Sequence, residues 1–180
     1  MEDTDEELME EVRNGNEEAM AGLYERYASR IYHLAKAMMG SEATAQDVVS
    51  EVFFRVYRYK QHFRPTVSFK AWIYQIAKNV IFSLSRRKKP VPLEPDWIPS
   101  KSDPVQEVEK EISREIFWQE FHRLPPQEQY LLTLYAMEGL SYTEISRLTG
   151  ISVSALKSRF HRIREKLREA LKKRGEWNDL

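Results

Sequence analysis

Residues 138–159 read EGLSYTEISRLTGISVSALKSR, and this stretch decides the fold of the second half of the chain. Ser141 and Glu144 stand three apart in a capping box, where each side chain satisfies a backbone N–H group at the start of a helix. Gly150 supplies the backbone freedom that a tight turn needs, and Ser152 is a favourable cap for a second, longer helix. Two helices joined by so short a turn predict a helix-turn-helix.

The second helix of this pair is expected to face DNA. The small core that fixes the two helices is predicted to consist of Ile145, Leu148, Ile151, Val153 and Leu156. The side chains left on or near one outward face, which can enter a major groove, are Ser154, Ala155, Lys157, Ser158, His161 and Arg162. Such patterns also arise by chance in helical proteins, so this motif alone leaves DNA reading and a purely structural role equally open.

Basic charge gathers in two blocks of a chain whose formal net charge is zero. Residues 52–93 contain ten Lys or Arg and no acid, and residues 147–174 contain ten more with only two acids. Solvated helix faces usually carry both positive and negative charges. The separation of basic from acidic residues therefore favours contact with nucleic acid. Seven acids crowd the first eleven residues. That acidic start fits either a solvated, helix-capping segment or one that faces a basic partner surface.

A proline-rich stretch divides the chain. Five of the eight prolines fall within residues 90–104, where fixed φ angles and missing N–H donors oppose regular structure. On either side, apolar residues recur at spacings of three and four, and no segment alternates like a strand. We therefore expect an all-α protein of two small helical domains, at residues 1–88 and 105–180, joined by a flexible linker at 89–104.

The first domain is expected to be a small bundle of helices at about residues 17–39, 42–60 and 69–87. Asn16, Ser41 and Ser68 stand at the expected N-caps, and Gly40 at the end of the first helix.

Several classes of protein are not expected. The chain has no cysteine, which excludes disulfides and fits a reducing cytoplasm, and no apolar run approaches the ~20 residues that a membrane helix needs. Sequences typical of metallopeptidases, phosphate-binding loops and serine hydrolases are absent, and the four histidines are widely scattered. We therefore expect a cytoplasmic protein that is not an enzyme, with no metal, no cofactor, no small-molecule substrate and no membrane insertion.

A series of motifs along the chain resembles the extracytoplasmic-function (ECF) group of the bacterial sigma-70 family. GNEEA (15–19), LYERY (23–27), QDVVSEVF (46–53), SFKAWIYQIAKN (68–79) and RRKK (86–89) are similar to its region 2. LPP (124–126), EGLSY (138–142) and VSALKSR (153–159) are similar to its region 4. The motifs stand in the family's order over nearly the whole chain, which is far more specific than any one of them.

The resemblance implies a transcription initiation factor that binds core RNA polymerase and directs it to promoters. Family members dock one helix of region 2 on the coiled coil of the largest polymerase subunit, which here implicates Asp47, Ser50, Glu51 and Arg55. Ser50 departs from the glutamine usual at its place. An anti-sigma factor is a further expected partner. Two rivals are a sigma mimic that only titrates an anti-sigma factor and an ordinary helix-turn-helix repressor.

The resemblance also implies which residues contact the two promoter elements. For the −10 element it implicates the loop at 61–66 and helix residues beyond it, namely Phe63, Arg64, Lys70, Lys78, Asn79, Arg86 and Arg87. Asn79 stands where the family places an asparagine that lines the pocket for a flipped base. Phe63 is balanced between base stacking and a core role, and for Trp72 the core is favoured. For the −35 element the candidates are Ser154, Lys157, Ser158, His161 and Arg162.

Overall fold

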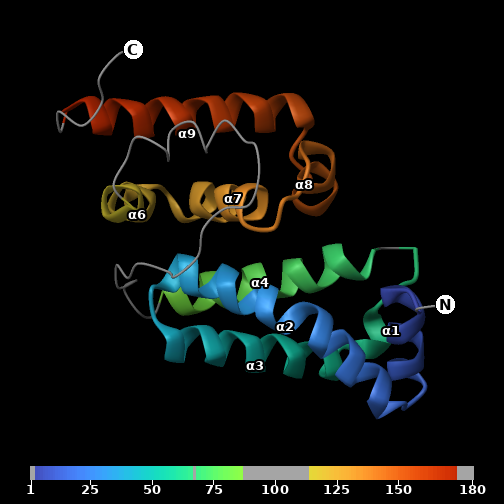
Figure 1. The fold of residues 1–180 in the computed structure, drawn as a ribbon. Helices are drawn as coiled ribbons and strands as arrows, with labels where there is room; N and C mark the ends of the chain where they lie inside the picture. Colours follow the sequence, from blue (N-terminus) through green and yellow to red (C-terminus); the bar gives the residue numbers. More distant parts are fainter. Residues whose placement is uncertain (1–2, 67, 87–113, 174–180) are drawn as a thin grey trace. The chain divides into compact units, whose positions relative to one another are not determined.

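The computed structural model describes residues 3–66, 68–86 and 114–173, and divides the chain into two compact units, Met1–Lys89 and Pro90–Leu180 (Figure 1). Every regular element in those described ranges is a helix, which confirms the all-α class. The first unit contains α1 (Asp5–Arg13), α2 (Glu17–Met39), α3 (Glu42–Arg58), the short 3₁₀ helix η1 (Lys60–His62) and α4 (Phe69–Ser85). The second contains α6 (Arg114–Arg123), α7 (Pro126–Ala136), α8 (Tyr142–Thr149) and α9 (Val153–Lys173). The expected linker at 89–104 lies outside the described residues.

The core of the first unit forms where α2, α3 and α4 pack against one another. Along α3, Val48, Val52 and Val56 recur every four residues and are fully buried, so they fix which face of the helix points inward. Helix α1, which the sequence had not predicted as a separate element, adds Met9 and Val12 to this core.

Local caps begin and end the first helices as expected. The side chains of Asn16 and Ser41 accept hydrogen bonds from backbone N–H groups in the first turns of α2 and α3. Gly40 ends α2 with a left-handed backbone at φ 70°, which glycine adopts without a steric penalty. Helix α3 ends at Arg58, two residues short of the expected end, because the chain tightens there into η1.

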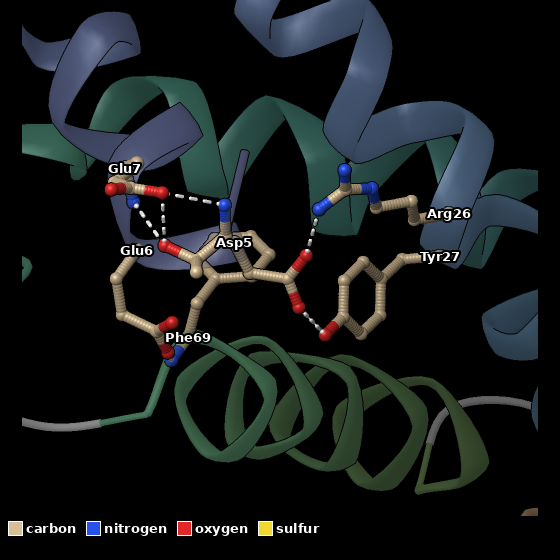
Figure 2. A network of polar contacts seen from close by, with 7 residues as sticks. Asp5, Glu6, Glu7, Arg26, Tyr27 and Phe69 are labelled. Carbon is tan, nitrogen blue, oxygen red and sulfur yellow. Dashed lines mark hydrogen bonds and ion pairs between the residues drawn. The ribbon is translucent and has the colours of Figure 1, made fainter. Parts of the chain in front are cut away.

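The start of α4 differs from the prediction. Ser68 occupies the N-cap position, but its side chain makes no capping hydrogen bond. The backbone N–H of Phe69 instead donates to Oε1 of Glu6 in α1, at 2.8 Å (Figure 2). Thr4 and Glu7 form a capping box at the start of α1 itself. Acidic residues at the start of the chain therefore cap both α1 and α4.

The second unit has the predicted helix-turn-helix in α8 and α9. The capping box of Ser141 and Glu144 is present, and Gly150 takes a left-handed backbone at φ 73° between the helices. Ser152 Oγ accepts a hydrogen bond from the backbone N–H of Ala155 at 3.3 Å, which caps α9. Of the five predicted core residues, Ile145 and Leu156 are fully buried and the other three are half-buried. The rest of the core comes from apolar side chains of α6, α7 and α9, among them Phe121, Leu131, Leu134 and Ile163.

Candidate protein and nucleic-acid interfaces

Helix α3 exposes an acidic face. Asp47 and Ser50 are exposed, and Glu51 and Arg55 are half-exposed, because the valines at the opposite face hold the helix in this rotation. Asp47 and Glu51 stand four apart and so lie on one side of the helix. Glu51 Oε1 accepts a hydrogen bond from Arg55 Nε at 2.6 Å. The structure thus places the four residues implicated in polymerase binding together on one accessible helix.

An apolar surface that the sequence did not reveal adjoins this face. Tyr24, Phe54 and Tyr57 are each about half exposed. Tyr24 also lines a shallow pocket between α2 and α3 together with Ala28, Ser29, Tyr32, Gln46, Val49 and Ser50. The signal for Phe54 was available in its place two residues from both Val52 and Val56, since a step of two residues turns a helix by about half a revolution. Phe53 is buried, and Phe54 points to solvent.

Basic side chains accompany these aromatic rings. The Arg58 guanidinium lies 5.9 Å from the ring centroid of Phe54, and Lys60 Nζ lies 4.0 Å from that of Tyr57. A cation over an aromatic face is attracted by the quadrupole of the ring. These pairs therefore place positive charge beside the exposed rings. The face of α3 is therefore mixed: carboxylates near its middle, and aromatic and cationic groups toward its end.

Helix α4 carries a polar face opposite its buried side. Gln75, Asn79 and Arg86 are exposed at spacings of four and seven residues, which place them along one side of the helix axis. Asn79 Oδ1 accepts a hydrogen bond from Gln75 Nε2 at 3.5 Å. Lys70 and Lys78 are half-buried on the same helix, and Arg64 is exposed in the preceding loop. Arg87, also implicated in promoter contact, lies outside the described residues.

Phe63, which the sequence left balanced between base stacking and a core role, is buried in this structure. Its side chain is only 2% exposed, and its ring centroid lies 5.9 Å from that of Phe69 and 5.3 Å from that of Trp72. This burial favours the core role, because neighbouring aromatic rings enclose the side chain. Phe63 anchors the loop to the bundle. Trp72, half-buried in the same cluster, has the core role that was favoured for it.

Helix α9 presents the predicted face. All five residues implicated in reading the −35 element are exposed: Ser154, Lys157, Ser158, His161 and Arg162. Leu156, Phe160 and Ile163 are buried on the other side and fix the rotation of the helix. Ser158 Oγ donates to the backbone oxygen of Ser154 at 3.1 Å, which leaves lone pairs of the hydroxyl available to a further donor.

Within the described ranges, the His, Asp and Glu side chains nowhere gather in a group of three that could hold a metal ion. None of the helices in that part of the chain is long and apolar enough to cross a membrane.

The fold and these surfaces define a helix-turn-helix protein with a second helical unit that exposes acidic, aromatic and amide groups. Residues 23–91 match the family model for sigma-70 region 2, and residues 114–167 match that for sigma-70 region 4. The chain belongs to the ECF group of the sigma-70 family.

Curated relatives agree with this assignment. The ECF RNA polymerase sigma-E factor of Escherichia coli K12 is 30% identical over 175 residues, which are 90% of this chain and 91% of the relative. The ECF sigma factor SigW of Bacillus subtilis is 29% identical over 91% of this chain and 95% of its own length. SigE of Mycolicibacterium smegmatis is 30% identical over 84% of this chain, which spans 61% of that longer relative.

Among solved structures, CnrH in complex with the cytosolic domain of CnrY has a similar fold. Its TM-score is 0.73 at 23% identity, and the match covers 95% of this chain and 99% of that one. The sigma factor RpoE of Bartonella quintana, solved with the anti-sigma factor NepR, matches with a TM-score of 0.61 at 20% identity, over 84% of this chain and 96% of that one.

Proposed function

We propose that this protein binds core RNA polymerase through α3 and directs it to promoters, holding the −10 element with α4 and the loop before it and reading the −35 element with α9. One observation carries the proposal: a single chain holds both a helix-turn-helix with an exposed polar face and a second unit that exposes carboxylates beside aromatic rings. A repressor needs only the first of these surfaces, and a mimic needs only the second.

Polymerase docking is assigned to the α3 face. Asp47 and Glu51 supply negative charge for a basic partner surface, which guides encounter and excludes wrong partners. The half-exposed rings of Tyr24, Phe54 and Tyr57 supply apolar contact area, and buried aromatic anchors carry much of the free energy of typical protein interfaces. Arg55 holds Glu51 in a fixed position through its 2.6 Å hydrogen bond.

The −10 element is assigned to the polar face of α4. The Asn79 amide has both donors and an acceptor to offer the edge of a flipped base, and its side chain is exposed on α4. Arg64, Lys70 and Arg86 supply positive charge for the backbone of the melted strand. Since Phe63 is enclosed, base contacts fall to the exposed loop residues and to α4.

The −35 element is assigned to α9. Its N-terminal turns carry Ser154, Lys157 and Ser158, the part of a recognition helix that meets base edges in the major groove. His161 and Arg162 lie one turn further on, where they reach bases or phosphates.

Two further parts of the proposal follow from this role. We propose that an anti-sigma factor binds and regulates the protein. The sigma factor RpoE of Bartonella quintana, which has a similar fold, was solved in complex with the anti-sigma factor NepR. We also place the protein in the cytoplasm, where polymerase and promoters meet, with nucleotide transfer left to the polymerase.

The test is a gel shift of promoter DNA with and without core polymerase, followed by run-off transcription. A sigma factor shifts DNA and supports transcription only when core is present. A repressor shifts duplex DNA alone, and a mimic shifts none under either condition. Either of the last two results would overturn the proposal.

A further inference from the structure

Helix α1 contacts both ends of the connection between α3 and α4. At the far end of α1, the backbone oxygen of Arg13 accepts a hydrogen bond from Gln61 Nε2 at 3.2 Å. At its near end, Glu6 Oε1 accepts from the backbone N–H of Phe69 at 2.8 Å. Between these two points the chain exposes Arg64, Pro65 and Thr66. The exposed loop is therefore tied to one helix on either side.

Helix α1 is itself held firmly. One oxygen of the Asp5 carboxylate accepts from Arg26 Nη1 at 2.7 Å, and the other accepts a short hydrogen bond from the Tyr27 hydroxyl (Figure 2). Burial and the hydrogen bond to Asp5 raise the pKa of Tyr27 far above its ordinary value, so the hydroxyl stays protonated and remains a donor. Met9 and Val12, one and two turns beyond Asp5 on the same side of α1, are buried against the bundle.

Glu6 also caps the first turn of α4 in place of Ser68. Ser68 makes no side-chain cap, so the first N–H group of α4 depends on the Glu6 carboxylate. A negative charge at this place also interacts favourably with the helix dipole. Phe69, whose N–H is held, is fully buried and packs its ring 5.9 Å from that of Phe63, which closes the loop from inside.

We infer that Glu6 is a positioning residue for −10 recognition: its carboxylate fixes where α4 begins and thereby how the loop and α4 are presented to DNA. This inference rests on the proposed function. Glu6 lies before residue 23, where the match to region 2 begins, and its hydrogen bond goes to the backbone of Phe69, which is not itself assigned to DNA or polymerase. Its effect on promoter choice is indirect, through the backbone of Phe69.

The experiment measures transcription by holoenzyme on a DNA library randomised in the −10 and −35 segments. Glu6→Ala is expected to lower preference at −10 positions roughly threefold to tenfold, the equilibrium equivalent of one lost hydrogen bond. Preference at −35 and affinity for core should stay within about twofold, inside the usual range for a surface change. Glu6→Gln keeps an oxygen acceptor at the same place and should recover most of the lost preference.

A matched control separates this effect from a general loosening of α1. Glu7→Ala removes the same charge from the next residue and breaks the α1 cap, but among the described residues the Glu7 carboxylate bonds to Thr4 and not to α4. Its −10 profile should equal that of the wild type. Amide hydrogen exchange gives a second readout: the Phe69 N–H should exchange faster in Glu6→Ala than in Glu7→Ala.

Three outcomes overturn the inference. One is a wild-type −10 profile in Glu6→Ala, another is an equal loss in Glu7→Ala, and the third is unchanged exchange at Phe69. A wild-type holoenzyme with no −10 preference at all would instead remove the proposed function, and the inference with it, so the two failures are distinguishable.

Discussion

The two units of this protein cap the starts of their helices in different ways. In the second unit, Ser141 caps α8 and Ser152 caps α9, each through a bond to a residue three positions later. In the first unit, α4 begins on a carboxylate that lies 63 positions earlier in the chain. The comparison teaches that the helix-turn-helix is specified by local sequence, whereas the loop before α4 depends on a distant helix.

The largest expected effect tests whether core polymerase binds to α3 in the first unit. Reversing both Asp47 and Glu51 to Lys should lower affinity for core polymerase by roughly a thousandfold or more, because two like-charge contacts each cost several kcal/mol. Co-elution with core on size exclusion measures this, and unchanged circular dichroism shows that the unit still folds. Glu169→Lys, a single charge reversal on α9, is the control for added basic charge and should co-elute normally. Normal co-elution of the double variant would contradict the assignment of α3.

The next effect tests whether the units are independent. Leu156 is fully buried in the helix-turn-helix, so Leu156→Ala should destabilise the second unit by about 2–5 kcal/mol. Urea unfolding measures the change, and the exposed neighbour Lys157→Ala should stay within about 0.5 kcal/mol of the wild type. Binding to core through the first unit should survive. Loss of that binding together with the second unit would show that the units are coupled.

A smaller effect concerns base preference, which one variant in each unit should change at a different promoter element. Lys157→Ala should lose roughly 1–3 kcal/mol of discrimination at one −35 position, and Asn79→Ala a similar amount at one −10 position. Each variant should leave the other element unaffected. Transcription from promoters carrying all four bases at each position provides the measurement. If both variants lower output equally on every sequence, these side chains contribute no base recognition.

The smallest effect compares two serines at N-cap positions. Ser141→Ala should cost about 0.5–2 kcal/mol of unfolding free energy, because it removes the capping bond to Glu144. Ser68→Ala should change the unfolding free energy by less than about 0.5 kcal/mol, because Glu6 caps that helix instead. Thermal unfolding of the two variants measures both changes. Equal losses of unfolding free energy would show that Ser68 caps α4 in solution.

The sequence was informative wherever the deciding contact is short-range. The caps at Asn16, Ser41 and Ser141 and the glycine ends at Gly40 and Gly150 were all predicted and are all present. Each joins residues no more than four apart, so the pattern is visible in the linear chain.

The sequence was less informative wherever tertiary packing decides. Phe63 stood in a loop bounded by polar residues and a proline, and nothing local showed that the rings of Phe69 and Trp72 would enclose it. The exposure of Tyr24 depends likewise on how α2 meets α3. The tie from Glu6 to Phe69 crosses most of the first unit, so no sequence period could reveal it. The roles of the exposed residues on α3, α4 and α9 remain predictions for the experiments above.

The hydrogen bond between Glu6 and the Phe69 backbone has a consequence for how promoter choice differs among related proteins. A substitution in α1 would retune −10 preference while every residue that faces DNA stays the same. Two relatives with identical α4 and α9 surfaces but different first helices would then control different sets of genes. Inferring such gene sets from DNA-facing residues alone would miss the difference, and comparisons that begin at residue 23 would omit its cause.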